Sequence, residues 1–294
     1  MTLANLISSI LSLSLLVLVF VLGLRAKFDE VTYLFRNPGL LCRSILAMNI
    51  LLVCIVVAAS VLLNLDPAIK IALVTLAVSP VPPLLPNKQM GAGGTSHYAI
   101  GLLVAASVVS VVLVPLSIEA IEHFFPFDLY IAPGKVFSVV AMSIFVPLIL
   151  GMLVGRLAPS VASRIAGPLS SIAMALLIVA IIPVLIKAWP DLSRLFGDGV
   201  VLSLVLFTVV GLALGHLLGG PEPANRTALA LASSTRHPAV AIAIATLNFP
   251  DVPGVPALIL YHLVIGGIVS TLYLRWRRGT TQPPIASSHA GGKG

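Results

Sequence analysis

Apolar runs about 20 residues long recur along the whole sequence, and this feature limits the fold more than any other. A helix of that length spans about 30 Å, the thickness of a bilayer's hydrocarbon core. Hydrophobic residues make up 59% of the 294 residues and charged residues 9%, with a mean hydropathy of +1.11. Since a helix satisfies its own backbone in lipid, the sequence predicts an all-α polytopic membrane protein.

Nine transmembrane spans are expected from these runs. They cover Thr2–Leu24, Leu40–Leu63, Ile69–Met90, Thr95–Ser117, Lys135–Gly155, Pro168–Lys187, Val200–Leu218, Thr227–Leu247 and Pro256–Leu274. The first run lacks a basic start and a small-residue cleavage site, so we interpret it as a retained span rather than a signal peptide. Residues 1–279 then form one transmembrane domain, and the polar tail 280–294 is expected to be disordered.

Charged residues predict the orientation of the spans. Ten basic residues all fall on one side: Arg25, Lys27, Arg36, Arg43, Arg156, Arg164, Arg226, Arg275, Arg277 and Arg278. The opposite side receives Asp66, Glu119, Glu122, Asp128, Asp191, Asp198 and Asp251. The positive-inside rule places the basic side in the cytoplasm, with the N-terminus outside and the C-terminus inside a cell (inner) membrane. The net charge of +7 is therefore interpreted as a topology signal, with no nucleic-acid partner expected.

Two spans are interrupted by residues that do not suit a continuous helix. In the third, Pro80, Pro82, Pro83 and Pro86 remove four helix donors. In the eighth, a polar stretch from Ser233 to His237 precedes Pro238, which is typical of one helix ending and another beginning.

The interruptions occupy matching positions in spans 1–4 and 6–9. Five spans separate equivalent elements, so the two sets run in opposite directions and form an inverted repeat. Prolines in a membrane helix are often simple kinks, which is the alternative interpretation for either span alone. A matched pair of interruptions favours a transporter binding site between them.

Three stretches resemble the bile acid:sodium symporter family: RAKFDEVTYLFRNPGLL, LLNLDPAIKIALVTLAVSP and LALASSTRHPAVAIAIATLNFP. The resemblance covers almost the whole chain. It implies a core domain (spans in 40–118 and 200–274), in which two broken helices cross, and a panel domain (spans in 2–24, 135–155 and 168–187). It also implies transport of organic anions such as bile acids, steroid conjugates, pyruvate or pantothenate.

The sequence departs from that family at the positions that hold sodium. Where the family has Pro-Gly-Gly-Thr-Ala-Ser-Asn in the first crossing helix, residues 80–86 read PVPPLLP. Ala232 stands in place of a family Glu, Arg236-His237 in place of a Gln-Asn pair, and Met48 in place of a Gln. Sodium prefers hard oxygen ligands, usually including a carboxylate. No Asp or Glu lies within a predicted span, so we expect transport without sodium.

Arg236 is the residue expected to take the place of the missing sodium ligands. A charge near the bilayer centre costs at least about 2.5 kcal/mol, so Arg236 is expected to face a cavity and meet an anionic substrate. The neighbouring candidates are Ser79, Pro80, Ser234, Thr235, His237 and Pro238. The α-helix starting at Pro238 adds a positive N-terminal dipole, and His237 can titrate, which allows proton coupling. The alternatives are an arginine that caps helix carbonyls and a histidine that merely packs.

Four further residues are weaker candidates for the substrate path. Lys88 stands at the far end of the first broken span, and His97 opens the fourth span, where an interfacial anchor is the alternative. His262 in span 9 either faces the crossing or packs against neighbours, and the amide of Asn49 is satisfied by a ligand or by another helix.

The leading hypothesis from these patterns is a secondary transporter of a small organic anion. The rival is a membrane sensor or partner-binding subunit on the same fold. An enzyme is not expected, because no nucleophile–base pair with suitable spacing lies within the spans; no metal-ligand spacing is present either. The sequence does not determine the substrate, the coupling ion or the oligomeric state.

Overall fold

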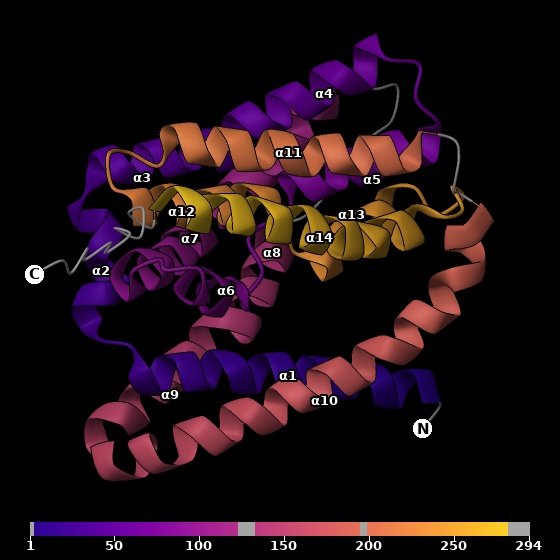
Figure 1. Ribbon diagram of the computed structural model, residues 1–294. Coiled ribbons are helices and arrows are strands. Elements are labelled where there is room, and N and C mark those ends of the chain that lie inside the picture. The colour runs from indigo at the N-terminus through magenta and orange to yellow at the C-terminus, as the bar shows by residue number, and fades with distance from the viewer. Residues whose placement is uncertain (1–2, 123–132, 195–198, 282–294) are drawn as a thin grey trace, which may run out of the picture.

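A computed structural model describes residues 3–122, 133–194 and 199–281, and the secondary structure within these ranges is helical (Figure 1). The helices are α1 (Leu3–Arg25), α2 (Phe28–Arg36), α3 (Pro38–Ile45), η1 (Leu46–Leu51), α4 (Leu52–Leu62), α5 (Pro67–Val78), α6 (Leu85–Gly91), α7 (Ser96–Glu122), α8 (Pro133–Val140), η2 (Ala141–Phe145), α9 (Val146–Leu157), α10 (Pro159–Arg194), α11 (Val200–Leu218), α12 (Pro223–Ser234), α13 (Pro238–Asn248) and α14 (Val255–Thr281). The π-helical segments η1 and η2 continue the α-helices around them. The predicted all-α fold is confirmed.

Several of these helices are long and apolar enough to cross a membrane. Within the described residues there are seven, or up to eight if Ser9–Arg25 and α2, which meet at 90°, form one span. The apolar helix α5 is shorter. These helices confirm a multi-pass membrane protein, while the count of nine spans and the inverted repeat stay predictions.

The helices form two groups in space. The first group contains α1, α9 and α10, which pack along one another, and Figure 1 shows it apart from α3–α5 and α11–α14. Glycines bring its backbones into contact: a Cβ on Gly23 would lie 2.3 Å from the carbonyl of Leu148, and one on Gly151 would lie 2.2 Å from that of Phe20. Small residues permit this close packing in lipid. The assignment of the groups to a panel and a core domain stays a prediction.

A second glycine series holds α12 against α11. Gly211, Gly215 and Gly219 follow one another at intervals of four residues, so they share one face of α11 and its end. A Cβ on Gly211 would lie 2.7 Å from the carbonyl of Ser233, and one on Gly215 would lie 2.4 Å from that of Leu229. The interrupted span that α12 begins is therefore positioned by direct backbone contact.

Three of the helices extend well beyond the spans predicted for them. The span expected from Pro168 belongs to α10, which begins at Pro159, because a proline suits the first turn of a helix. The fourth span continues beyond its predicted end at Ser117 to Glu122. The last span continues to Thr281, so residues 280–281 of the predicted tail are helical. Residues 282–294 lie outside the described residues.

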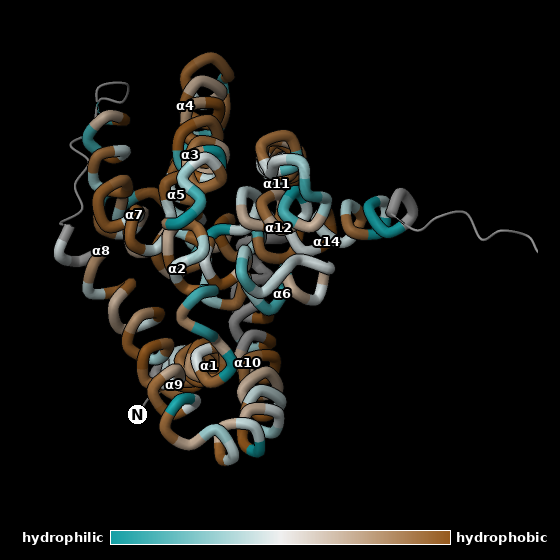
Figure 2. The backbone as a smooth tube through the Cα atoms, turned by 90° about the vertical axis from the view of Figure 1, so that its left-hand side faces the viewer, coloured by the Kyte–Doolittle hydropathy of each residue, from teal (hydrophilic) through white to brown (hydrophobic). Residues whose placement is uncertain are grey.

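One end of the bundle carries hydrophilic residues. Figure 1 shows α2, the α11–α12 turn and the C-terminal end of α14 on one side, and the α4–α5 and α13–α14 connections on the other. Hydrophilic residues gather along α2 and at the end of α14 (Figure 2). The short helix α2, which was not expected, is fixed to α7 because Ser96 Oγ donates to the buried Glu30 carboxylate at 2.5 Å.

Candidate functional site

The two interrupted spans meet at their breaks. The main-chain N–H of His237, between α12 and α13, donates to the carbonyl of Pro80, between α5 and α6, at 2.9 Å. A residue before proline is pushed out of the helical conformation, and Ser79 (φ −68°, ψ 147°) and His237 (φ −78°, ψ 103°) both have extended backbones. The predicted break positions are confirmed, and the two breaks contact each other at a place that we call the crossing. Its location at mid-membrane stays a prediction.

The side chain of Arg236 joins three elements at this crossing. Its exposed fraction is 0%. Nη1 donates to the carbonyl of Ser79 at 3.2 Å, and Nη2 donates to the carbonyl of Met48 in η1. The carbonyls at a helix C-terminus lack partners within the helix, and Arg236 supplies one to the end of α5. The guanidinium therefore takes the carbonyl-capping position that was the alternative to a cavity-facing arginine.

Several buried polar atoms at the crossing have no hydrogen-bond partner. They are Nε of Arg236, both ring nitrogens of His237, and Nδ1 of His262. The His262 ring hydrogen-bonds with the backbone of Ser234 and packs edge-on against Phe207 at 5.0 Å. Because buried polar groups are nearly always hydrogen-bonded, these atoms are available to a polar ligand or to water.

The other candidates in the two breaks are occupied within their own helices. Ser79 Oγ donates to the carbonyl of Leu76 at 2.8 Å, and Ser234 Oγ donates to that of Leu231 at 3.2 Å. Thr235 caps the end of α12, and Pro238 begins α13 without a side-chain cap from His237. The crossing thus brings together the residues expected there, with arginine and histidine nitrogens as its unpaired groups.

Two of the weaker candidates are less closely tied to the crossing. His97 lies in the first turn of α7, where its exposed ring pairs with Asp29 at 3.1 Å and stands edge-on to Tyr33 at 5.9 Å. This is the interfacial arrangement that was the alternative for His97. Lys88 lies half-buried in α6, past the first break.

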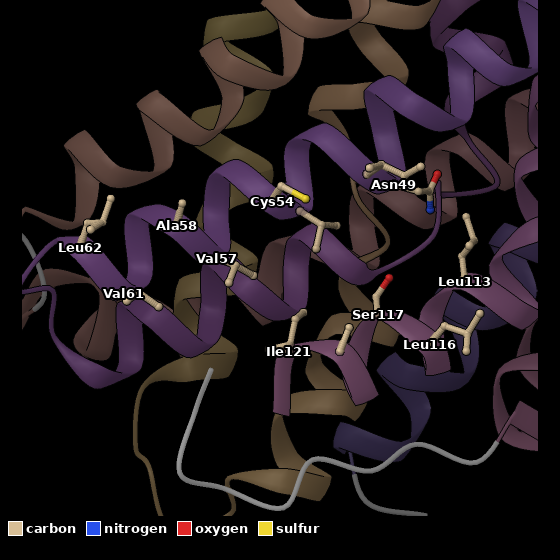
Figure 3. Close-up of a pocket in the computed structure, with 13 residues that line it drawn as sticks. Asn49, Cys54, Val57, Ala58, Val61, Leu62, Leu113, Leu116, Ser117 and Ile121 are labelled. Atoms are coloured by element: carbon tan, nitrogen blue, oxygen red, sulfur yellow. The ribbon is translucent and has the colours of Figure 1, made fainter. Parts of the chain in front are cut away.

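Asn49 lies next to the Arg236 contact and lines an open groove of about 580 Å³ between η1, α4 and α7. Figure 3 shows Asn49 at one end, with Cys54, Val57 and Ala58 along α4 and Leu113, Leu116 and Ser117 opposite. The lining is mostly apolar, and several of its side chains, including Leu62 and Leu116, are exposed on the outside of the bundle. The groove therefore runs from the outer surface of the bundle to Asn49, which follows Met48 in the sequence. It was missed because nothing distinguishes its residues within an apolar run.

The crossing offers few oxygen ligands for a sodium ion. The carbonyls of Ser79 and Met48 accept hydrogen bonds from Arg236, and the positive charge of its guanidinium repels a cation at these oxygens. Ala232 supplies no carboxylate where the family has one. Among the described residues, no group of three or more His, Cys, Asp or Glu side chains is placed to hold a metal. This donor set does not fit sodium.

Comparison with known families identifies the chain. Residues 12–190, more than half of the sequence, match the sodium bile acid symporter family. The chain belongs to this family. Membership in a symporter family agrees with a membrane transporter and with the resemblance noted from the sequence. A search of curated proteins finds no match.

The matched residues of the symporter family end before α11. They include the first interruption, between α5 and α6, while Arg236, His237 and the rest of the second interruption follow the matched segment. The family match therefore does not include the second interruption, which is known from the structure of this chain alone. The π-helical position of Met48 was not expected from the sequence, because an apolar run carries no signal for a π-segment.

Proposed function

We propose that the protein is a secondary transporter of a small organic anion, working by alternating access, with its substrate site at the crossing of the two broken spans. The observation that carries the proposal is the set of unpaired buried nitrogens of Arg236, His237 and His262. An anionic oxygen is the natural acceptor for Nε–H of Arg236 and for the one N–H of a neutral His237 ring, and hydrogen bonds to a charged group are about twice as strong as neutral ones.

Arg236 also supplies a permanent positive charge where related transporters bind sodium. Its two donations to main-chain carbonyls hold together the α5 end, η1 and the second break, which is a role that a bound cation performs by coordinating oxygens. We propose that this fixed cation removes the need for sodium, and that protonation of His237 is the coupling event if transport is coupled.

The apolar groove supports a substrate with an apolar body. It ends at Asn49, next to the carbonyl that Arg236 contacts. A substrate with a carboxylate at the polar crossing and a hydrocarbon body along α4 would fit both the crossing and the groove. This fit favours the bile acid or steroid-conjugate class over pyruvate. Figure 3 shows the length of α4 that would contact such a body.

The proposed setting is a cell membrane with the basic end of the bundle in the cytoplasm. The α2 end, the α11–α12 turn and the end of α14 lie on one side of the bundle (Figure 1), as the charge pattern requires. With the basic end in the cytoplasm, the proposed orientation has the N-terminus outside and the C-terminus inside.

Uptake by purified protein in liposomes tests the proposal. Labelled cholate, pyruvate and pantothenate are offered in parallel to liposomes with the protein and to liposomes without it. We expect saturable uptake of at least one anion, with cholate favoured. Protein that binds an anion, as measured by thermal stabilisation, yet never accumulates it would contradict transport and favour the sensor hypothesis.

A further inference from the structure

Three arginines from three separate elements converge on the turn between α11 and α12. Arg226 of α12 donates through Nε to the carbonyl of Gly220 at 2.6 Å. Arg43 of α3 reaches the same glycine, since a Cβ on Gly220 would lie 3.6 Å from its Nη1. Arg277 of α14 donates to the carbonyl of Pro223 at 3.3 Å and to Thr227 Oγ1 at 3.2 Å. The positive-inside rule explains arginines in loops, but it does not require them to meet.

Main-chain contacts fix the position of two of these guanidinium groups. Arg226 and Arg277 each donate to a carbonyl of the turn or of the first turn of α12, so their planes are held in place. A guanidinium has five N–H groups, and the one donation of Arg226 leaves others for a further acceptor. Gly220 has a φ of +83°, which favours glycine, and it presents no side chain beside Arg43.

Aromatic side chains place this cluster at the level of lipid headgroups. Trp276 is 55% exposed, and its ring lies 5.8 Å from that of Tyr273 and 5.9 Å from the guanidinium carbon of Arg277. The Tyr273 hydroxyl is bonded to His216 Nδ1 at 2.8 Å. Tryptophan and tyrosine are enriched where a membrane helix crosses the interface between hydrocarbon and water.

We infer that Arg43, Arg226 and Arg277 form a binding site for the phosphate group of an anionic phospholipid, with Trp276 and Tyr273 beside the upper part of its chains. A phosphate offers several oxygens to paired N–H groups, and the planar guanidinium matches this arrangement better than an ammonium. Basic pockets between transmembrane helices bind anionic headgroups in this way. The site is separate from the proposed substrate site and does not rest on transport activity.

The lipid would tie α3, α12 and α14 together at one end of the bundle. All three elements belong to the group of helices that holds the crossing (Figure 1), and α12 leads directly to the second break. Occupation of the site therefore stabilises the folded protein, because a ligand that binds only the folded state raises its unfolding free energy.

Thermal unfolding of the full-length protein in a neutral detergent tests this site. Dioleoylphosphatidylglycerol is titrated against wild type, Arg43→Gln and Arg43→Lys, with dioleoylphosphatidylcholine and inorganic phosphate as separate titrations. Arg43 is exposed, so its replacement is compatible with folding. Arg164→Gln serves as the matched control, because Arg164 is an exposed arginine of α10, outside the cluster.

We expect phosphatidylglycerol to raise the unfolding temperature more than phosphatidylcholine does. Arg43→Gln should raise the lipid concentration at half-maximal stabilisation about fivefold, the effect of one basic residue at a membrane surface. Arg43→Lys should lie between, and Arg164→Gln should match wild type. Equal responses of Arg43→Gln and Arg164→Gln would overturn the site. Inorganic phosphate as effective as the lipid would overturn the lipid as its occupant.

Discussion

Nη1 of Arg236 donates a hydrogen bond of 3.2 Å to the carbonyl of Ser79, 157 residues earlier in the chain. This contact joins the two helix breaks through a side chain, in addition to the backbone bond from His237 to Pro80. The guanidinium thus supplies a hydrogen-bond donor to the carbonyl at the end of α5. The prolines that follow this helix end cannot supply one, because they have no main-chain N–H. The mutations below separate this structural role from substrate binding.

Arg236→Gln should lower stability even without substrate. The variant leaves the carbonyls of Ser79 and Met48 without the guanidinium, and two bonds from a charged donor contribute roughly 3 kcal/mol together. Arg236→Lys should recover part of this loss, because an ammonium does not reproduce the planar fork. Thermal unfolding in detergent measures both, with the exposed Arg164→Gln as control. An Arg236→Gln protein as stable as wild type would show that these carbonyls find other partners.

His237→Phe should weaken substrate binding without lowering the stability of the protein. Both ring nitrogens of His237 are buried and unpaired, so an apolar ring of similar shape removes an unsatisfied group and should keep or raise the unfolding temperature. If those nitrogens contact the substrate, stabilisation by cholate should be lost. His97→Phe, at an exposed position on α7, is the control that should keep it. Full cholate stabilisation in His237→Phe would remove His237 from the site.

Gly215→Ala should disturb the placement of the second broken span. The added Cβ would lie 2.4 Å from the carbonyl of Leu229 and 2.5 Å from Cα of Ala230, so the backbones of α11 and α12 must separate. Overpacking of this kind costs about 1–3 kcal/mol. Gly267→Ala is the matched control, since nothing lies within 4 Å of its Cβ position. Equal unfolding temperatures for the two variants would show that α12 does not depend on close packing at Gly215.

The sequence predicted the elements that proline and charge mark, and it missed those that only packing creates. Pro80 and Pro238 located the breaks because each removes a donor and constrains the residue before it. The capping role of Arg236 remained one of two alternatives, because whether a guanidinium meets a carbonyl or a ligand depends on distances that the sequence does not contain. The predicted start of the sixth span at Pro168 was wrong for a related reason, since a proline within a helix and a proline at its first turn look alike in sequence.

Ala58→Trp should test whether the groove holds the apolar body of the substrate. Ala58 is exposed and lines the groove, so an indole there fills space along α4 without displacing buried groups. Uptake of cholate should fall by at least about tenfold, the effect of roughly 1.4 kcal/mol, while uptake of a small anion such as pyruvate should be little changed. Val112→Trp changes an exposed position of α7 that is not part of the groove lining. Equal cholate uptake in both variants would exclude the groove.

The most direct test of the proposed mechanism is substrate uptake in liposomes after sodium chloride is replaced by choline chloride at equal ionic strength. Since Arg236 occupies the carbonyls of Ser79 and Met48 and Ala232 brings no carboxylate, the initial rate of anion uptake should be the same in both salts. An initial rate that rises steeply with sodium and vanishes in choline would contradict the account, because it would require a sodium site that the crossing does not provide.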